Sequence, residues 1–264
     1  MQKQTEINQN ADKIAGQKVF ADDGFYFGIG AFETIAVEDG VPQLLAWHLE
    51  RLRKSLAFFK IAQTVEEQEV NTWLKEYEES EEKRHGALKI TVSAQNKQFT
   101  LRKNTYTKEQ YQKGFRLDFS SIRRNETSPL TYHKTLAIAE NILEKRKAKV
   151  SGLDELIFQN QKGQISEGCT TNIFFKKDNR LFTPPVSSGM LPGVMRRYII
   201  EETRRKGVLL EEKELYPGDV EWFDGCFVTN SLLGVMPAAS LGDRNFDVGQ
   251  ILHFAEDFGL PFLL

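Results

Sequence analysis

The feature that most constrains the fold is a repeated alternation of short strand-like runs and longer helix-like runs along the 264 residues. Residues 32–47, FETIAVEDGVPQLLAW, predict a hairpin, because Glu38, Asp39 and Gly40 form a turn sequence between two apolar runs. A helix is predicted over 46–60, where leucines recur at helical spacings. The pattern predicts a mixed α/β (α+β) protein with a sizeable core.

The alternation continues along the rest of the chain. Helices are also predicted over 65–80, from Lys134 onward, over 192–206 and near 246–259, and strands over 87–93, 98–103, 115–120, 153–166, 171–177, 181–183, 208–214 and 224–240. The polar stretch 121–132, SIRRNETSPLTY, is typical of a connector. We therefore expect an amino-terminal small domain over 1–118, a connector over 119–131 and a larger carboxyl-terminal domain over 132–264.

Composition excludes several classes of protein. With 40% hydrophobic residues, 27% charged residues and a net charge of −2, the chain gives no support to a nucleic-acid or membrane-surface role. Residues 1–13 lack the apolar core of a secretory signal, and no window approaches the roughly 18 apolar residues of a membrane span.

Cysteine and histidine usage points to a metal-free cytoplasmic protein. Cys169 and Cys226 lie far apart without metal-ligand spacing, which fits a reducing cytosol, and Cys169 is expected to be a small buried residue. The four histidines form no metal-binding motif.

Three glycines crowd the stretch 24–33, GFYFGIGAFE. Their spacing matches neither GxGxxG nor GxxxxGK[ST], so a phosphate loop is not indicated. The stretch instead predicts a tight, aromatic-rich turn in which one backbone closely approaches another.

Lys134 lies at what reads as the start of a helix within residues 129–152, PLTYHKTLAIAENILEKRKAKVSG. The residues Leu136, Ala139, Ile142 and Leu143 follow at the spacings of an apolar stripe. The first turn of a helix favours acids over cations, so the ammonium group needs an explanation. Taken alone, it is a lysine whose stem packs while its head reaches water.

Three other segments carry polar groups next to apolar strands. Glu167, in SEGCTTNIFF, is either a surface turn residue or an oriented carboxylate. Residues 188–197, SGMLPGVMRR, have the form of an anion site, because small glycines precede the free N–H groups of a helix start. Residues 228–237, VTNSLLGVMP, predict either a polar turn or the rim of a ligand site.

In their order, HKTL, SEGCTTNIF, MLPGVMR and VTNSLLGVMP resemble the fold-type IV pyridoxal-phosphate enzymes, the class IV aminotransferase family. FGIGAFETIAVEDGVPQLLAWHLERL is similar to that family's FGDGxFE hairpin and H-x-x-R-L helix, so the resemblance covers roughly residues 18–240. It implies a two-domain D-amino-acid aminotransferase-like fold, pyridoxal 5'-phosphate as the cofactor and a small-molecule amine as the substrate. It also implies a homodimer, with sites between the two domains and close to the subunit boundary.

The resemblance implies a role for each matched residue. Lys134 matches the Schiff-base lysine, and removal from water would lower its pKa more than a helix start does. Glu167 matches the carboxylate that pairs with the pyridine nitrogen, and Arg51 matches the phosphate-binding arginine. The other implied cofactor contacts are the backbone N–H groups of Val194 and Met195 and the hydroxyl of Ser231 at the phosphate, and Thr170 or Thr171 at the ring hydroxyl or phosphate.

Within the family, VTNSLLGVMP and HKTL are similar to the 4-amino-4-deoxychorismate lyases of the folate pathway, which release pyruvate and 4-aminobenzoate. Transaminases more often carry an acid where Gly234 stands. An aminotransferase of branched-chain or D-amino acids, and a cofactor-binding relative without activity, remain alternatives.

The substrate contacts are less defined. The arginine-rich segment that clamps the substrate carboxylate in D-amino-acid enzymes is absent from residues 89–103, and so is the Arg-Gly of many lyases. Lys89, Lys97 or Arg102 is expected to supply the positive charge. Thr34 is expected to relay a proton, and Asn230 to contact the substrate.

Overall fold

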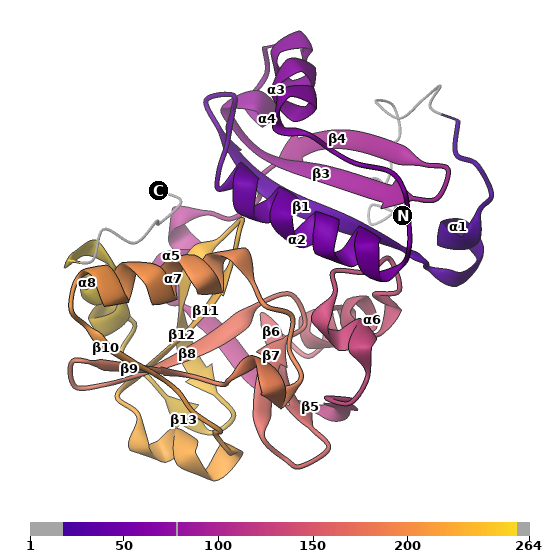
Figure 1. The fold of residues 1–264 in the computed structure, drawn as a ribbon. Helices are drawn as coiled ribbons and strands as arrows, with labels where there is room; N and C mark the ends of the chain where they lie inside the picture. Colours follow the sequence, from indigo (N-terminus) through magenta and orange to yellow (C-terminus); the bar gives the residue numbers. More distant parts are fainter. Residues whose placement is uncertain (1–17, 78, 258–264) are drawn as a thin grey trace. The chain divides into compact units, whose positions relative to one another are not determined.

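The computed structural model of the protein describes residues 18–77 and 79–257, which form two compact units. Unit 1 contains the described residues up to 104 together with residues 134–137, and unit 2 contains residues 105–133 and 138–257. Figure 1 shows the helices and strands of both units. Each unit contains one sheet, which confirms the mixed α/β class. None of the described helices is long and apolar enough to cross a membrane.

Unit 1 contains an antiparallel sheet of four strands in the order β2-β1-β3-β4. Its strands are β1 (Gly30–Glu38), β2 (Val41–Pro42), β3 (His85–Ser93) and β4 (Lys97–Lys103), and its helices are α1 (Asp23–Phe27), α2 (Leu45–Phe58), α3 (Glu67–Glu76) and α4 (Glu81–Arg84). The predicted hairpin is confirmed as β1 and β2, which Asp39 and Gly40 join with positive φ angles.

One face of this sheet packs on helix α2, as Figure 1 shows. Side chains alternate between the two faces of a strand and recur every three to four residues on a helix. Ile35 and Val37 of β1 therefore point to the same side, where they share a core with Leu49 and Leu52 of α2. The leucine spacing in the sequence predicted this helix and its buried face.

Residues 134–136 are extended rather than helical. The backbone N–H of Phe32 donates to the carbonyl of Lys134 at 3.0 Å, and the N–H of Leu136 donates to the carbonyl of Gly30 at 3.0 Å. The helix α6 (Ala139–Val150) begins only after this pairing ends. The prediction of a helix start at Lys134 is therefore wrong, and so is the argument that a helix dipole acts on its amine.

The predicted apolar stripe of α6 is also wrong. Ile142 and Leu143 are 37% and 59% exposed, whereas Glu144 and Ala148 are buried. The helix buries a charged group here because Glu144 accepts a hydrogen bond from the hydroxyl of Ser120 at 2.6 Å.

Unit 2 contains a mixed sheet whose path is β10-β9-β8-β11-β12-β5-β6-β7, with β13 paired to β12. Its strands are β5 (Phe115–Arg124), β6 (Glu155–Asn160), β7 (Ile165–Gly168), β8 (Asn172–Lys177), β9 (Arg180–Thr183), β10 (Leu209–Glu212), β11 (Gly225–Asn230), β12 (Gly234–Leu241) and β13 (Arg244–Asn245). Its helices are α5 (Lys108–Lys113), α6, α7 (Val194–Arg205) and α8 (Val248–Asp257), with short 3-10 turns at Pro129–Tyr132, Val186–Ser188 and Pro217–Trp222. The core of the unit is aromatic, with Phe175, Phe182 and Phe223 in mutual contact.

The predicted connector is wrong over residues 119–124, which belong to strand β5. This strand lies between β6 and β12, and its backbone pairs with both. Residues 121–123 of the strand are exposed, and two of the three, Ser121 and Arg123, are polar or charged. Unit 2 accordingly begins at residue 105 rather than after the predicted connector. Residues 1–17 of the predicted first domain, and residues 258–264 with the end of the predicted last helix, lie outside the described residues.

The pairing of residues 134–136 with β1 depends on Gly30. The close backbone approach predicted for GFYFGIGAFE is found at this glycine, but the predicted turn is wrong, because residues 23–27 form helix α1 and Gly30 lies in strand β1. A Cβ atom at Gly30 would lie 2.6 Å from the carbonyl oxygen of Val92 and 2.7 Å from Cδ1 of Leu136. A backbone atom cannot move away cheaply, so position 30 accepts only glycine without a shift of the strand.

We expect Gly30→Ala to lower the free energy of unfolding by about 2 kcal/mol, the usual effect of overpacking. Chemical denaturation measures it. Gly218→Ala is the control, because nothing lies within 4 Å of a Cβ at that position. Equal stability of the two variants would contradict the close approach at Gly30.

Candidate active site

A buried carboxylate in unit 1 binds the predicted phosphate-binding arginine. Glu33 of β1 accepts hydrogen bonds from Arg51 Nε at 2.8 Å and Arg51 Nη2 at 2.6 Å. Its Oε2 also forms a hydrogen bond with Nδ1 of His48, at 2.7 Å. The Glu33 side chain is fully buried, and that of Arg51 is 11% exposed. This bidentate pairing fixes the guanidinium of Arg51 at the surface of the core.

The charge states of this group follow from its neighbours. Burial opposes ionisation of Glu33, but the Arg51 guanidinium and His48 outweigh it and lower the pKa of Glu33 to about 2. Burial lowers the pKa of His48, Glu33 offsets part of that effect, and Arg51 and Lys134 reinforce it. An ionised Glu33 accepts hydrogen bonds only, so a neutral His48 donates from Nδ1. Its Nε2 is buried and has no hydrogen-bond partner among the residues that the structure describes.

Lys134 lies beside an aromatic ring of the same unit. Its Nζ is 4.5 Å from the centroid of the Phe32 ring, and Nζ of Lys89 is 5.0 Å from the same centroid. Thr34 is directly opposite Lys89 in the pairing of β1 with β3. The structure thus brings three predicted residues, Lys134, Lys89 and Thr34, around Phe32. Arg51 binds the other side of β1, through Glu33.

Glu167, the predicted partner of the pyridine nitrogen, is a buried residue of β7 in unit 2. Its Oε1 accepts from Arg124 Nη2 at 2.8 Å, and its Oε2 accepts from the backbone N–H of Leu191 at 3.1 Å. Arg124 also lies 4.5 Å from the ring centroid of Phe158. Glu167 is therefore an oriented carboxylate, and its charge is paired with a guanidinium.

The start of helix α7 is an uncapped helix end. Its N-cap is Gly193, with no side-chain cap, and it is followed by Val194 and Met195. A Cβ atom at Gly193 would lie 2.0 Å from Oδ1 of Asn172, whose Nδ2 donates to the carbonyl of Leu191 at 3.0 Å. Asn172 thus holds the loop against β8, and N–H groups at such a helix start suit an anion.

Among the predicted threonines, the two neighbours differ. Thr171 is buried, and its hydroxyl has no hydrogen-bond partner within the described part of the chain. Thr170 is exposed, and its N–H donates to Glu155 at 2.7 Å. Of the two, Thr171 has the hydroxyl left for a ligand.

The VTNSLLGVMP segment is the turn between β11 and β12. Oδ1 of Asn230 accepts the N–H groups of Leu232 and Leu233, each at 2.9 Å, and Ser231 is half-buried in the turn. Nδ2 of Asn230 donates to the carbonyl of Thr170 at 3.3 Å. Asn230 therefore shapes the turn, and its contact with a substrate stays a prediction.

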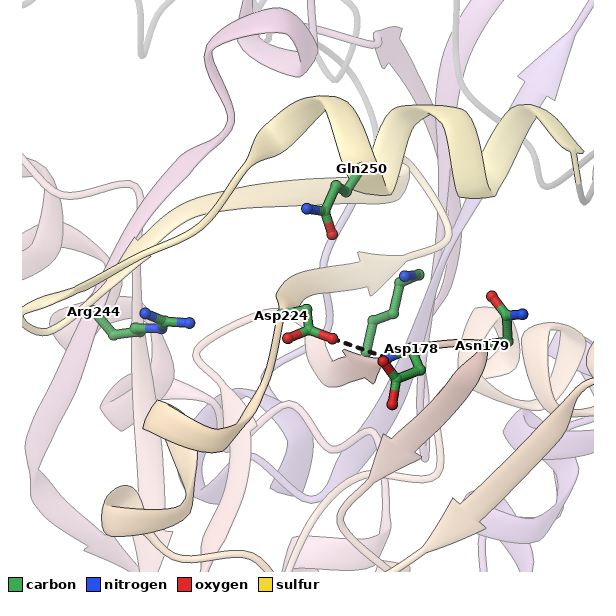
Figure 2. A pocket seen from close by; sticks show the side chains of 6 residues that line it. Asp178, Asn179, Asp224, Arg244 and Gln250 are labelled. Atoms are coloured by element: carbon green, nitrogen blue, oxygen red, sulfur yellow. Dashed lines mark hydrogen bonds between the residues drawn. The ribbon is translucent and has the colours of Figure 1, made fainter.

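Figure 2 shows the side chains that line a surface pocket, and none of the predicted residues is among them. The pocket has a volume of about 570 Å³. It lies in unit 2 and is lined by Lys176, Asp178, Asn179, Asp224, Arg244 and Gln250. Asp224 accepts from Lys177 Nζ at 2.8 Å and from the N–H of Asp178 at 2.9 Å. The carboxylate of Asp224 thus has structural partners, and none of the predicted site residues lines this pocket, so it is not the candidate site.

Sequence reasoning missed several residues of these groups. Glu33 and His48 stand inside the FGIGAFE and HLERL motifs, so the spacing of His48 and Arg51 on one helix was an available signal. Arg124 stood in a stretch interpreted as a connector and gave no signal. The expectation for Cys169 is confirmed: it is buried, and burial raises the pKa of its thiol to about 12. No cluster of metal-ligating side chains occurs among the described residues.

Comparison with known proteins identifies the family. The model of the amino-transferase class IV family matches residues 30–241, and the chain belongs to this family. The chain is 28% identical to the aminodeoxychorismate lyase of Bacillus subtilis (strain 168), over 85% of this chain and 82% of that protein. It is 26% identical to the D-alanine aminotransferase of Bacillus licheniformis, over 86% of this chain and 84% of that protein.

A solved structure has the same fold. The 4-amino-4-deoxychorismate lyase of Pseudomonas aeruginosa has a TM-score of 0.79 to this chain at 23% identity, over 92% of this chain and 94% of that one. Together with the family match, this confirms the fold-type IV architecture.

Members of this family bind pyridoxal phosphate. Three features of unit 2 fit such a group: an uncapped helix start behind a glycine that tolerates no Cβ, a buried hydroxyl at Thr171 without a partner in the described residues, and an oriented carboxylate at Glu167. An anion cradle, a hydroxyl and a carboxylate match a phosphate, a ring hydroxyl and a ring nitrogen.

The charged group around Glu33 predicts a pH-dependent stability. Because the pKa of Glu33 is lowered from 4.5 to about 2, its contribution is present above pH 4.5 and is lost as the pH falls toward 2. At pH 7, Glu33→Gln should lower the free energy of unfolding by about 3 kcal/mol, because a buried pair loses one partner. The difference from wild type should shrink between pH 4.5 and pH 2 in denaturant titrations.

The matched control is Glu50→Gln, which removes a half-exposed carboxylate from the same helix that carries Arg51. Exposed pairs of this kind contribute under about 1 kcal/mol. A pH-independent difference between wild type and Glu33→Gln would show that Glu33 is not ionised in the folded protein.

Proposed function

We propose that this chain is a pyridoxal-phosphate-dependent 4-amino-4-deoxychorismate lyase, which releases pyruvate and 4-aminobenzoate. The observation that carries the choice among family reactions is the turn between β11 and β12. Its sequence, VTNSLLGVMP, is similar to that of the lyases, and its geometry suits the glycine at position 234.

The φ angle of Gly234 is +63°, a conformation that side-chain-bearing residues rarely adopt. Its carbonyl accepts from the hydroxyl of Thr229 at 2.6 Å, which locks the turn. Glycine adopts this conformation more readily than the acid that many transaminases carry at this position. The similarity to the Bacillus subtilis lyase over 85% of the chain supports the same choice.

Lys134 and Thr34 are the residues proposed to act on the reacting atoms. When bound, pyridoxal phosphate supplies an aldehyde that condenses with amines and a ring that accepts electrons. Lys134 would hold that aldehyde through Nζ and, once exchanged for the substrate amine, move a proton. Thr34 would relay this proton. Aromatisation of the product supplies most of the driving force, so the protein needs only to orient groups and take the proton.

The other residues would hold the cofactor in place. Glu167 would keep the ring nitrogen protonated, because a carboxylate held beside that nitrogen favours its proton. Arg51, whose guanidinium Glu33 orients, would bind the phosphate. The further proposed contacts are the N–H groups of Val194 and Met195 and the hydroxyl of Ser231 at the phosphate, Thr171 or Thr170 at the ring hydroxyl or phosphate, and Asn230 at the substrate.

Two alternatives are outcomes of the same test. The similarity to a D-alanine aminotransferase over 86% of the chain favours a transaminase as the second candidate. The third is a cofactor-binding relative without activity. We also propose that the protein is a cytoplasmic homodimer. Light scattering would test this by comparing the mass of the protein in solution with the 30.3 kDa of one chain.

The decisive assay supplies aminodeoxychorismate, made in situ from chorismate and glutamine by its synthase, to the purified holoenzyme. We expect 4-aminobenzoate and pyruvate in equal amounts, and loss of turnover by more than a thousandfold in Lys134→Ala, because no other amine is proposed to carry the aldehyde. Chromatography of 4-aminobenzoate measures the rate. Transfer of amino groups to keto acids without 4-aminobenzoate would replace the lyase by a transaminase.

A further inference from the structure

The turn between β11 and β12 consists of residues 231–233, because Asn230 and Gly234 are the last pair of the two strands. Gly234 closes the turn in the left-handed conformation, as is common for three-residue hairpin turns. Leu233 and Gly234 are both buried. A buried backbone carbonyl needs a hydrogen-bond donor, so the stability of this turn depends on the groups that donate to its carbonyls.

Side-chain hydroxyls donate to both of these carbonyls. The hydroxyl of Thr229 donates to the carbonyl of Gly234 at 2.6 Å, within the hairpin itself. The hydroxyl of Tyr111 donates to the carbonyl of Leu233, also at 2.6 Å, although 122 residues separate the two in sequence. Tyr111 is only 1% exposed, so water cannot easily replace its hydroxyl. This long-range bond holds the turn to a helix outside the hairpin.

The position of the Tyr111 hydroxyl is fixed by its own surroundings. Tyr111 lies in α5, and its ring belongs to the same core as Phe115 and Leu233. Gly114 ends the helix with a φ angle of +69°, and a Cβ atom there would lie 3.0 Å from the backbone nitrogen of Ala239 in β12. The end of α5 therefore lies directly against β12. A ring packed in a dense core has little freedom to move, so its hydroxyl is a fixed anchor for the turn.

The anchored turn belongs to the candidate cofactor site. Ser231, whose hydroxyl is proposed to contact the phosphate, is half-buried and lies two residues before Leu233. Nδ2 of Asn230 donates to the carbonyl of Thr170 at 3.3 Å, which links the turn to the neighbour of Thr171. A displaced Leu233 carbonyl would displace Ser231, because both belong to the same three-residue turn.

We propose that Tyr111 is a positioning residue for the cofactor phosphate. Through the carbonyl of Leu233, it holds the turn in the conformation that presents the hydroxyl of Ser231. The phosphate contact of Ser231 rests on the proposed function, whereas the bond between Tyr111 and the turn does not. Removal of the Tyr111 hydroxyl should therefore lower the affinity for the phosphate group of the cofactor alone.

The test compares two probes, pyridoxal 5'-phosphate and pyridoxal, which differ only in the phosphate group. Fluorescence titration of the full chain, after removal of its cofactor, measures the dissociation constant of each probe. Tyr111→Phe keeps the ring in the core and removes the hydroxyl. We expect it to weaken binding of pyridoxal 5'-phosphate about tenfold and binding of pyridoxal less than about twofold, because a buried carbonyl of the turn loses its donor.

A double-mutant cycle tests whether Tyr111 acts through Ser231. Ser231→Ala should itself weaken binding of pyridoxal 5'-phosphate about tenfold, because a hydrogen bond to a charged group is lost. In the Ser231→Ala background, Tyr111→Phe should weaken it by less than about a further twofold, since the contact that it positions is already gone. Additive effects of the two substitutions would contradict the proposal.

The matched control is Tyr216→Phe, which removes the hydroxyl of a tyrosine of unit 2 that is 43% exposed. That hydroxyl accepts from Gln164 Nε2 at 3.5 Å, outside the turn between β11 and β12. We expect both dissociation constants of Tyr216→Phe to stay within about twofold of wild type. A phosphate-specific loss as large as that of Tyr111→Phe would show that the effect does not arise in the turn.

Three further results would overturn the positioning role. Equal weakening of both probes by Tyr111→Phe would indicate a general effect on the core, and unchanged binding of both would show that the turn does not need the hydroxyl. Unchanged phosphate affinity in Ser231→Ala would remove the contact that Tyr111 is proposed to position. A chain that forms no 4-aminobenzoate but shows the expected phosphate-specific losses would retain the positioning role and reject the lyase.

Discussion

The backbone pairing between residues 134–136 and the start of β1 is the constraint on which the candidate site of unit 1 depends. Two hydrogen bonds of 3.0 Å join these segments, although about a hundred residues separate them in sequence. They pair because Gly30 leaves room for Leu136. The amine of Lys134 is therefore placed beside Phe32 by a sheet-like contact, and its helix, which begins at Ala139, contributes nothing to that placement.

Successive side chains of strand β1 point to opposite faces of the sheet, and the two faces carry different groups. Glu33 points into the core, where Arg51 pairs with its charge and His48 donates a hydrogen bond to it. Its neighbours Phe32 and Thr34 point to the other face, where Lys89 and Lys134 lie. A one-residue change of register would exchange the two sets, so the strand's pairing with β3 fixes which residues face a ligand.

Two carboxylates of unit 2 are also buried, and each is stabilised by a cation and a backbone N–H group rather than by exposure to water. Glu167 accepts from Arg124 and from the N–H of Leu191, and Glu155 is paired with Lys145 and accepts from the N–H of Thr170. Both acids are buried on adjacent strands, and removing either partner would leave an uncompensated charge. The hydrogen bond from the N–H of Leu191 joins Glu167 to the loop before helix α7. This carboxylate therefore links strand β7 to the start of α7, and both belong to the candidate cofactor site.

The sequence predicted what local periodicity encodes. Helix α2, the β1–β2 hairpin and the strands around Glu167 follow from apolar spacing and turn residues, and the motifs pointed to Lys134, Glu167 and Arg51. It did not predict contacts whose partners are distant in the chain. The extended segment at Lys134 was predicted to be helical, because the local pattern contains no signal of its pairing with β1. Strand β5 was predicted to end too early, because its exposed residues are polar.

The central claim is that Nζ of Lys134 is the amine that carries the cofactor. Borohydride reduction of the purified holoenzyme, followed by peptide mapping with mass spectrometry, tests it directly. We predict a reduced pyridoxyl-phosphate adduct on the peptide containing Lys134, and none in Lys134→Ala. An adduct on Lys89 or on another lysine in the wild-type protein, with Lys134 unmodified, would contradict the account.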